Sequence, residues 1–125
     1  MLIRREGPGD QTAIHAIHLA AFGQSATAGT VEARLVDELR ECDGWIGALS
    51  LVAVEGDEIT GHVVCTRATV GPDNQPLLGL GPLGVRPDRH GTGVGKALMH
   101  AVEGKSGGFL WGTQEIRNGF VAGSW

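Results

Sequence analysis

The first part of the chain alternates between apolar and polar positions in a way that predicts one short strand and two helices. Leu2 and Ile3 favour a strand, which the turn-forming run Gly7-Pro8-Gly9 ends. Apolar residues then recur at helical spacing over 11–22 and over 31–40, and the intervening segment, rich in small and polar residues, predicts a loop over 23–29. The second helix is expected to face the core with a stripe at i, i+4 and i+8: Val31, Leu35 and Leu39.

The middle of the chain predicts three strands. The apolar, partly β-branched runs 49–54 and 59–70 flank the turn Glu55-Gly56-Asp57, which is typical of an antiparallel hairpin. A third strand is expected over 77–85. Pro82 interrupts it, and because proline cannot donate to a sheet ladder, a β-bulge is expected there.

A glycine-rich loop follows the third strand and leads into a helix expected over 94–103. Beyond Gly104 the pattern weakens, and only 109–111 and 119–122 suggest further strands. The resulting order β-α-α-β-β-β-loop-α predicts an α/β domain.

The composition narrows the class of protein. A chain of 125 residues, 42% of them hydrophobic, with a mean hydropathy of +0.01, is expected to form one domain spanning 1–125. No apolar run approaches the roughly 20 residues that a membrane span needs, and the net charge of −4 argues against nucleic acid as a partner. Cys42 and Cys65, in a chain without an export signal, are expected to be free thiols in the cytoplasm.

The segment R-H-G-T-G-V-G-K-A-L, residues 89–98, places three glycines around the start of the expected helix. This much backbone freedom suggests that a ligand comes close to the backbone, and the question is which ligand. A Walker-type phosphate loop fails at His90, where glycine is required, and at Ala97, where serine or threonine is required. A dinucleotide-binding fingerprint fails because the spacing is G-x-G-x-G and the preceding strands are antiparallel.

A bulged strand with proline, followed by this glycine loop and a helix, resembles motif A of the GNAT acetyltransferase superfamily. The preceding element order and the opening L-I-R-R-E-G-P-G-D are also similar to that family. The resemblance implies a mixed, mainly antiparallel sheet with a splayed, bulged strand and helices on both faces. It also implies that acetyl-CoA is a co-substrate, bound by the strand backbone and the loop through Leu83, Gly84, Val85, Arg89, His90, Gly91, Thr92, Gly93, Val94, Gly95 and Lys96.

The chemistry of the loop agrees with this interpretation. Amides that open a helix lack intrahelical acceptors and lie at the positive end of the helix dipole, which suits a pyrophosphate. Glycine allows phosphate oxygens to approach closely. Arg86, Arg89 and Lys96 against Asp88 give the segment a local charge of +2 (3 − 1). His90 stands where the family usually has glutamine or arginine, and it can still donate a hydrogen bond.

The catalytic groups are harder to find. The family commonly uses a tyrosine as proton donor, but the sequence has none, and 77–85 carries no titratable side chain. Residues 105–125 look atypical or truncated beside the family pattern, although Gly119-Phe120 resembles part of it. His62 is a weak candidate for the base, with a hydrogen-bonded or surface strand residue as the alternative. His15 and His18 are expected on the helix surface, with no metal site, and Cys65 in the core.

The expected activity is therefore transfer of an acetyl group from acetyl-CoA to a primary amine, carried by a small molecule or a peptide. The first two helices and the loop 23–29 are expected near the acceptor. A non-catalytic acyl-CoA-binding module or a truncated, inactive relative remains an alternative. A homodimer that covers an exposed sheet edge also remains open.

Overall fold

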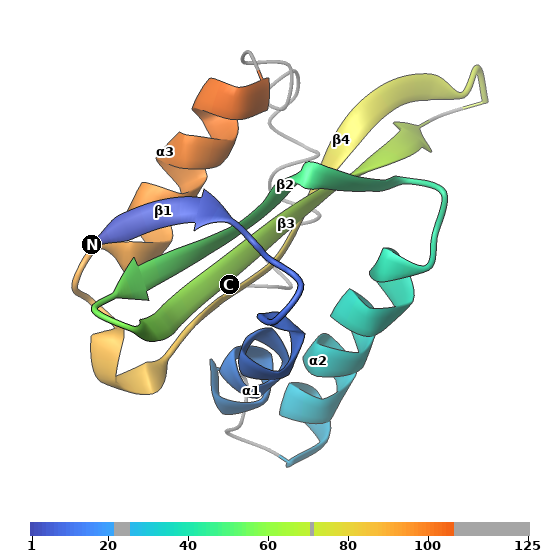
Figure 1. Ribbon diagram of the computed structural model, residues 1–125. Helices are drawn as coiled ribbons and strands as arrows, with labels where there is room; N and C mark the ends of the chain where they lie inside the picture. The colour runs from blue at the N-terminus through green and yellow to red at the C-terminus, as the bar shows by residue number, and fades with distance from the viewer. Residues whose placement is uncertain (22–25, 71, 107–125) are drawn as a thin grey trace.

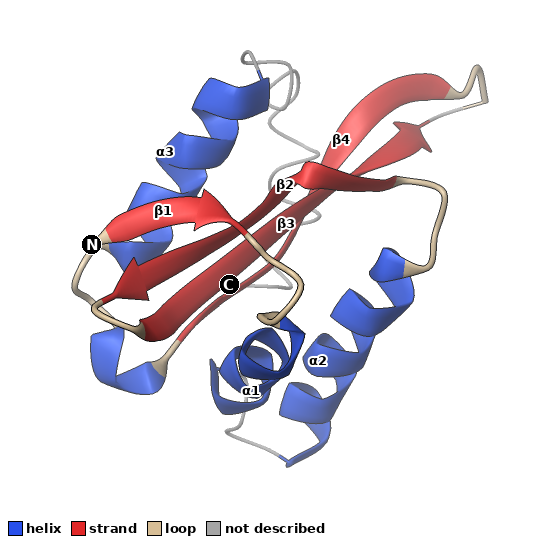
Figure 2. Ribbon diagram, in the orientation of Figure 1, coloured by secondary structure: helices blue, strands red, loops and turns tan. Residues whose placement is uncertain are grey.

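The computed structural model describes residues 1–21, 26–70 and 72–106. Four strands form one antiparallel sheet in the order β1-β2-β3-β4, as Figures 1 and 2 show. The strands are β1 (Leu2–Arg5), β2 (Trp45–Glu55), β3 (Glu58–Val70) and β4 (Gln75–Val85). The helices are α1 (Gln11–Ala21), α2 (Ala26–Arg40) and α3 (Val94–Ser106), and a short 3₁₀ helix, η1 (Pro87–Arg89), follows β4.

Helices cover both faces of the sheet. The pair α1 and α2 packs on one face, and α3 packs on the other (Figure 1). Strand β3 is buried on both sides because its alternate residues point to opposite faces. Val63 and Cys65 join the core under α3, whereas His62 lies against α1.

The bulge predicted at Pro82 is present in β4. Val63 pairs with Leu83 and Cys65 pairs with Leu80, so two residues of β4 lie opposite one residue of β3. Residues three apart in a regular strand would point to opposite faces. The extra residue instead places Leu80 and Leu83 in the same core beneath α3.

The prediction of an α/β fold with helices on both faces is confirmed. All described strands are antiparallel, and no parallel pair of the expected mixed sheet is found among the described residues. Lys105 still belongs to α3, which runs three residues further than predicted, to Ser106. The strands suggested over 109–111 and 119–122 also lie outside the described residues.

The second helix differs from its prediction. It begins at Ala26, so the expected loop is wrong for 26–29 and the helix continues through Gly29. Its packing against α1 outweighs the local preference for a loop. The buried face carries Ala33 and Val36, whereas Val31 of the predicted stripe is 54% exposed.

Candidate functional site

A cavity of about 410 Å³ lies where the end of α1, the end of β4 and the start of α3 meet. Ala21 lines it from α1, and Leu83 and Val85 line it from β4. The remaining lining residues come from η1, the glycine loop and the first turn of α3: Arg89, His90, Gly91, Gly93, Val94, Gly95 and Lys96. The structure therefore brings most of the predicted cofactor-binding residues to one cavity.

The glycine loop has the backbone that its sequence requires. Gly91 has φ +77° and Gly93 has φ +94°, which side-chain-bearing residues rarely adopt. A Cβ atom at either glycine would meet no heavy atom within 4 Å, so the space above the loop is clear of described protein. Val94 follows as the first residue of α3 and anchors the loop, because its side chain is buried in the core.

Several backbone amides at this helix start remain available to a ligand. The first helical hydrogen bond runs from the Ala97 amide to the Gly93 carbonyl at 3.0 Å, so the amides of residues 94–96 lie before it. Thr92 has a hydrogen-bond partner within the loop itself, and its predicted contact with the cofactor stays a prediction. Its amide and hydroxyl both donate to the Arg89 carbonyl, at 3.3 and 2.6 Å, and so fix the shape of the loop.

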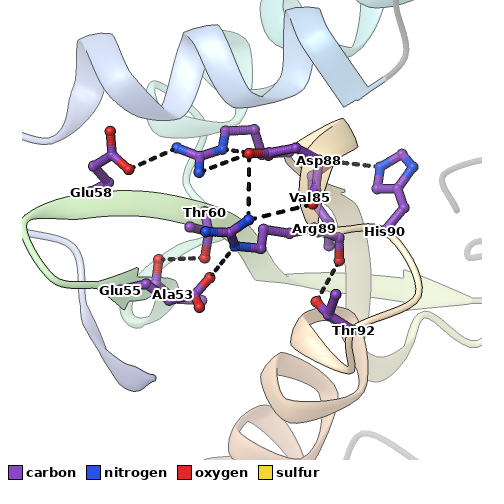
Figure 3. Close-up of polar contacts among 10 residues, drawn as sticks. Ala53, Glu55, Glu58, Thr60, Val85, Asp88, Arg89, His90 and Thr92 are labelled. Carbon is purple, nitrogen blue, oxygen red and sulfur yellow. Dashed lines mark hydrogen bonds and ion pairs between the residues drawn. The ribbon is translucent and has the colours of Figure 1, made fainter.

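The local positive charge counted from the sequence is largely compensated in the structure, as Figure 3 shows. Arg89 pairs with Glu55 at 2.9 Å, and Arg86 pairs with Asp88 and Glu58 at 2.6 and 3.4 Å. The two glutamates come from the β2–β3 hairpin, which the sheet brings beside η1. Of the three cations in this segment, Lys96 alone has no ion pair within the described part of the chain.

His90 also has a hydrogen-bond partner. Its Nε2 donates to the Val85 carbonyl at 2.7 Å (Figure 3), which ties the loop back to the end of β4. The imidazole therefore contacts one of the backbone groups predicted to bind the cofactor. The prediction that His90 also contacts phosphate stays a prediction.

A second group of polar side chains is buried between α1, β2 and β3. The buried polar chain, as we call it, consists of four side chains: Glu6, Ser50, His62 and His18. Nε2 of His18 lies 2.8 Å from Nδ1 of His62, and Nε2 of His62 lies 2.9 Å from Oγ of Ser50. Ser50 donates to Oε1 of Glu6, whose Oε2 accepts from Arg40 at 2.6 Å.

Burial sets the protonation of both histidines. Desolvation lowers the pKa of His18 to about 4, with smaller effects from His15 and Arg40. Desolvation also lowers the pKa of His62 well below its ordinary value, assisted by His18 and Arg40. Both rings are therefore neutral at pH 7.

The prediction that His18 lies on the helix surface is wrong, because its side chain is fully buried. The sequence did carry a signal: His18 follows Ile17 on the apolar face of α1. His62, the weak candidate for the base, lies in the interior and does not line the cavity. Sequence reasoning missed Glu6 and Ser50 because neither has a distinctive local pattern.

The remaining candidates have ordinary structural roles. His15 is partly exposed and lies 3.3 Å from Asp37, as expected for a surface residue. Cys42 and Cys65 are both free thiols, and burial raises the pKa of Cys65 to about 12, which makes it a poor nucleophile.

Within 1–21, 26–70 and 72–106, no three metal-ligating side chains gather into a possible site. No helix in those ranges is long and apolar enough to cross a membrane.

Comparison with known proteins agrees with this geometry. The sequence pattern of the acetyltransferase (GNAT) family matches residues 12–115. An uncharacterised N-acetyltransferase of Escherichia coli (strain K12), YjhQ, is 39% identical over 92 residues, which is 72% of this chain and 48% of that protein. The chain thus spans about half the length of this curated relative.

Two solved structures are similar in both fold and sequence. A GNAT family acetyltransferase from Brucella melitensis, in complex with acetyl-CoA, is 34% identical with a TM-score of 0.76; the match covers 86% of this chain and 68% of that one. The Escherichia coli protein YhbS, in complex with CoA, is 30% identical with a TM-score of 0.70; the match covers 83% of this chain and 54% of that one.

Proposed function

Because the chain belongs to the acetyltransferase (GNAT) family, we propose that it transfers an acetyl group from acetyl-CoA to a primary amine. The observation that carries the proposal is the cavity formed by the glycine loop, the start of α3 and the end of β4. The acceptor is a small molecule or a peptide with a free amine. It is expected to enter near α1 and α2, since the end of α1 lines the cavity at Ala21.

The loop is suited to the pyrophosphate of coenzyme A. The amides of residues 94–96 point out of the helix start, and the helix dipole favours an anion there. The positive φ angles of Gly91 and Gly93, with clear space above both, allow phosphate oxygens close to the backbone. Lys96 supplies a positive charge that is not held in an ion pair with any described residue.

The end of β4 is suited to the pantetheine arm. This strand pairs with β3 on one side, and within the described ranges no strand pairs with its other side. The backbone of Leu83, Gly84 and Val85 is therefore the expected hydrogen-bonding edge for the arm. When bound, acetyl-CoA supplies a thioester whose acetyl carbon an amine can attack; the protein orients the two and accepts the proton that leaves the amine.

Replacing Lys96 by glutamine should weaken acetyl-CoA binding roughly tenfold, since a hydrogen bond to a charged group contributes about 1.5–3 kcal/mol and this one is exposed. The loss should shrink as salt is raised, because the contact is ionic. Titration calorimetry at two salt concentrations measures both effects. Lys105→Gln, at the far end of the same helix, is the matched control and should bind normally; equal losses in the two variants would contradict this role for Lys96.

One observation supports a second candidate, a non-catalytic acyl-CoA-binding module. No carboxylate of the described residues lines the cavity, and the sequence has no tyrosine to serve as proton donor. Such a module would bind acetyl-CoA without consuming it.

Thiol release from acetyl-CoA separates the two candidates. The assay uses a panel of defined amines: a simple alkylamine, a polyamine, an aminoglycoside and a peptide with a free N-terminus. An acetyltransferase releases thiol with at least one of them and acetylates it, as mass spectrometry would show. Tight acetyl-CoA binding without turnover on any amine would favour the module.

A further inference from the structure

His90 lies at the wall of the cavity, where its side chain is exposed to solvent. Its Nε2 lies 2.7 Å from the carbonyl oxygen of Val85 (Figure 3), and because a carbonyl oxygen can only accept, Nε2 must carry a proton. In the neutral ring the other nitrogen, Nδ1, is therefore unprotonated and presents a lone pair. Nδ1 makes no hydrogen bond with any described residue.

A neutral imidazole held in this tautomer cannot hydrogen-bond to an anion through Nδ1. The oxygens of a pyrophosphate only accept hydrogen bonds, and the lone pair on Nδ1 would repel them. Protonation of Nδ1 turns this nitrogen into a charged donor, while Nε2 keeps its hydrogen bond to Val85. The Val85 carbonyl thus holds the ring in a state in which only the protonated form suits an anion.

The charges around the cavity leave a place for one more cation. The pyrophosphate of coenzyme A is a dianion, whereas Lys96 is the one cation of the loop segment that has no ion pair with a described residue. Arg86 and Arg89 are held by carboxylates, and β4 adds no titratable side chain. A protonated His90 would supply the second positive charge and balance the dianion.

The titratable groups on the elements around His90 do not supply an anion for a protonated ring. From α1, Ala21 lines the cavity and the buried His18 is neutral at pH 7; from α3, Lys96 is a cation. The groups of η1, of its flanking residue and of the β2–β3 hairpin beside it are paired with one another: Arg86, Asp88, Arg89, Glu55 and Glu58. The carboxylates beside η1 are thus occupied by arginines, and a bound anion is what would favour protonation of His90.

We infer that acetyl-CoA binds with His90 protonated, so that binding takes up a proton from solution; this inference rests on the proposed acetyl-CoA site. The proton adds to Nδ1 of His90, and no bond of the ligand breaks. Imidazole is the side chain whose charge ordinarily changes between about pH 5 and pH 8, so the affinity for acetyl-CoA should rise as the pH falls through this range. The glutamine or arginine that the family usually has at this position would give no such dependence.

Titration calorimetry with acetyl-CoA at pH 6 and pH 8 measures the pH dependence, and circular dichroism checks the fold at both. From pH 8 to pH 6, the affinity should rise roughly fivefold more in the wild type than in His90→Gln, as expected for one charge-assisted contact at an exposed site. Glutamine keeps an uncharged donor for the Val85 carbonyl. The variant also corrects for the phosphate monoester of the ligand, which itself titrates near about pH 6. His90→Arg, with a permanent charge, should bind tightly at both pH values.

Repeating the titration at pH 7 in two buffers with different enthalpies of ionisation measures the proton uptake directly. The wild type should take up about half a proton more per ligand than His90→Gln. His100→Gln is the matched control, because it replaces an exposed histidine of α3 that does not line the cavity, and it should behave as the wild type.

The outcomes separate this inference from the function on which it rests. Equal pH dependence and equal proton uptake in the wild type and His90→Gln would overturn the role of protonated His90 and leave the acetyl-CoA site standing. A loss of affinity in His90→Gln that is the same at both pH values would assign His90 a structural role only, and so overturn the inference too. A wild-type protein that binds no acetyl-CoA at either pH would overturn the proposed function, and this inference with it.

Discussion

Gly93→Val should fold but bind acetyl-CoA roughly 100-fold more weakly, because it combines backbone strain of about 1–3 kcal/mol with the loss of amide contacts worth about 0.5–1.5 kcal/mol each. Gly93 has φ +94°, where a β-branched residue is strongly disfavoured. No described atom lies within 4 Å of a Cβ at this position, so the side chain would meet the ligand rather than the protein core. Circular dichroism checks the fold and titration calorimetry measures the affinity.

Gly56→Val is the matched control for this prediction. Gly56 also has a positive φ, +62°, and a Cβ atom there would likewise meet no described atom within 4 Å, but it lies in the β2–β3 turn and does not line the cavity. It should show a comparable loss of stability and nearly normal acetyl-CoA affinity. Normal affinity in a folded Gly93→Val protein would refute the assignment of the loop as the pyrophosphate site.

The second large effect is a loss of stability on acidification. The unfolded chain protonates His18 near its ordinary pKa of 6.5, whereas the folded protein holds the pKa at about 4. Between these values the unfolded state binds more protons, so the free energy of unfolding falls as pH falls. Above pH 6.5, His18 makes its full contribution to the free energy of unfolding, roughly 3 kcal/mol. This contribution is lost by about pH 4. His62 acts in the same direction, since its pKa is also lowered.

Urea unfolding across this pH range measures the effect. In His18→Gln the fall in stability with acidification should be clearly shallower than in the wild type, even though the variant is less stable at every pH. Ile14→Val, which removes one buried methylene group on the same helix and changes no titratable side chain, should keep the wild-type slope. Identical slopes in the wild type and His18→Gln would contradict the assigned burial of His18. Asp10 titrates below the pH range from 4 to 6.5 over which His18 acts, because its hydrogen bond with Arg4 lowers its pKa from 3.8.

Features with short-range physical causes could be predicted from the sequence. Pro82 has no amide proton to pair with a neighbouring strand, which predicts a bulge, and the register between β3 and β4 contains one. The strands of the β2–β3 hairpin were indicated by β-branched runs on both sides of a Gly56 turn. The glycine loop was recognisable because its chemistry lies within a few consecutive residues.

Features that depend on packing between distant segments could not be predicted in this way. The start of α2 was missed because Gly29 signals a break locally, while contacts with α1 keep the helix intact. The charge of the loop was misjudged because Glu55 and Glu58 are brought to the arginines by the sheet. The four side chains of the buried polar chain lie far apart in the sequence, between positions 6 and 62. Nothing in the local sequence around any of them indicates that they contact one another.

Calorimetric titration of the protein with acetyl-CoA, with ATP as the comparison ligand, tests the central claim most directly. We predict binding of one acetyl-CoA per chain, with an affinity in the range of about 1 µM to 1 mM that is usual for enzyme substrates, and markedly weaker binding of ATP. The absence of acetyl-CoA binding at millimolar concentration, or a clear preference for ATP, would contradict the account.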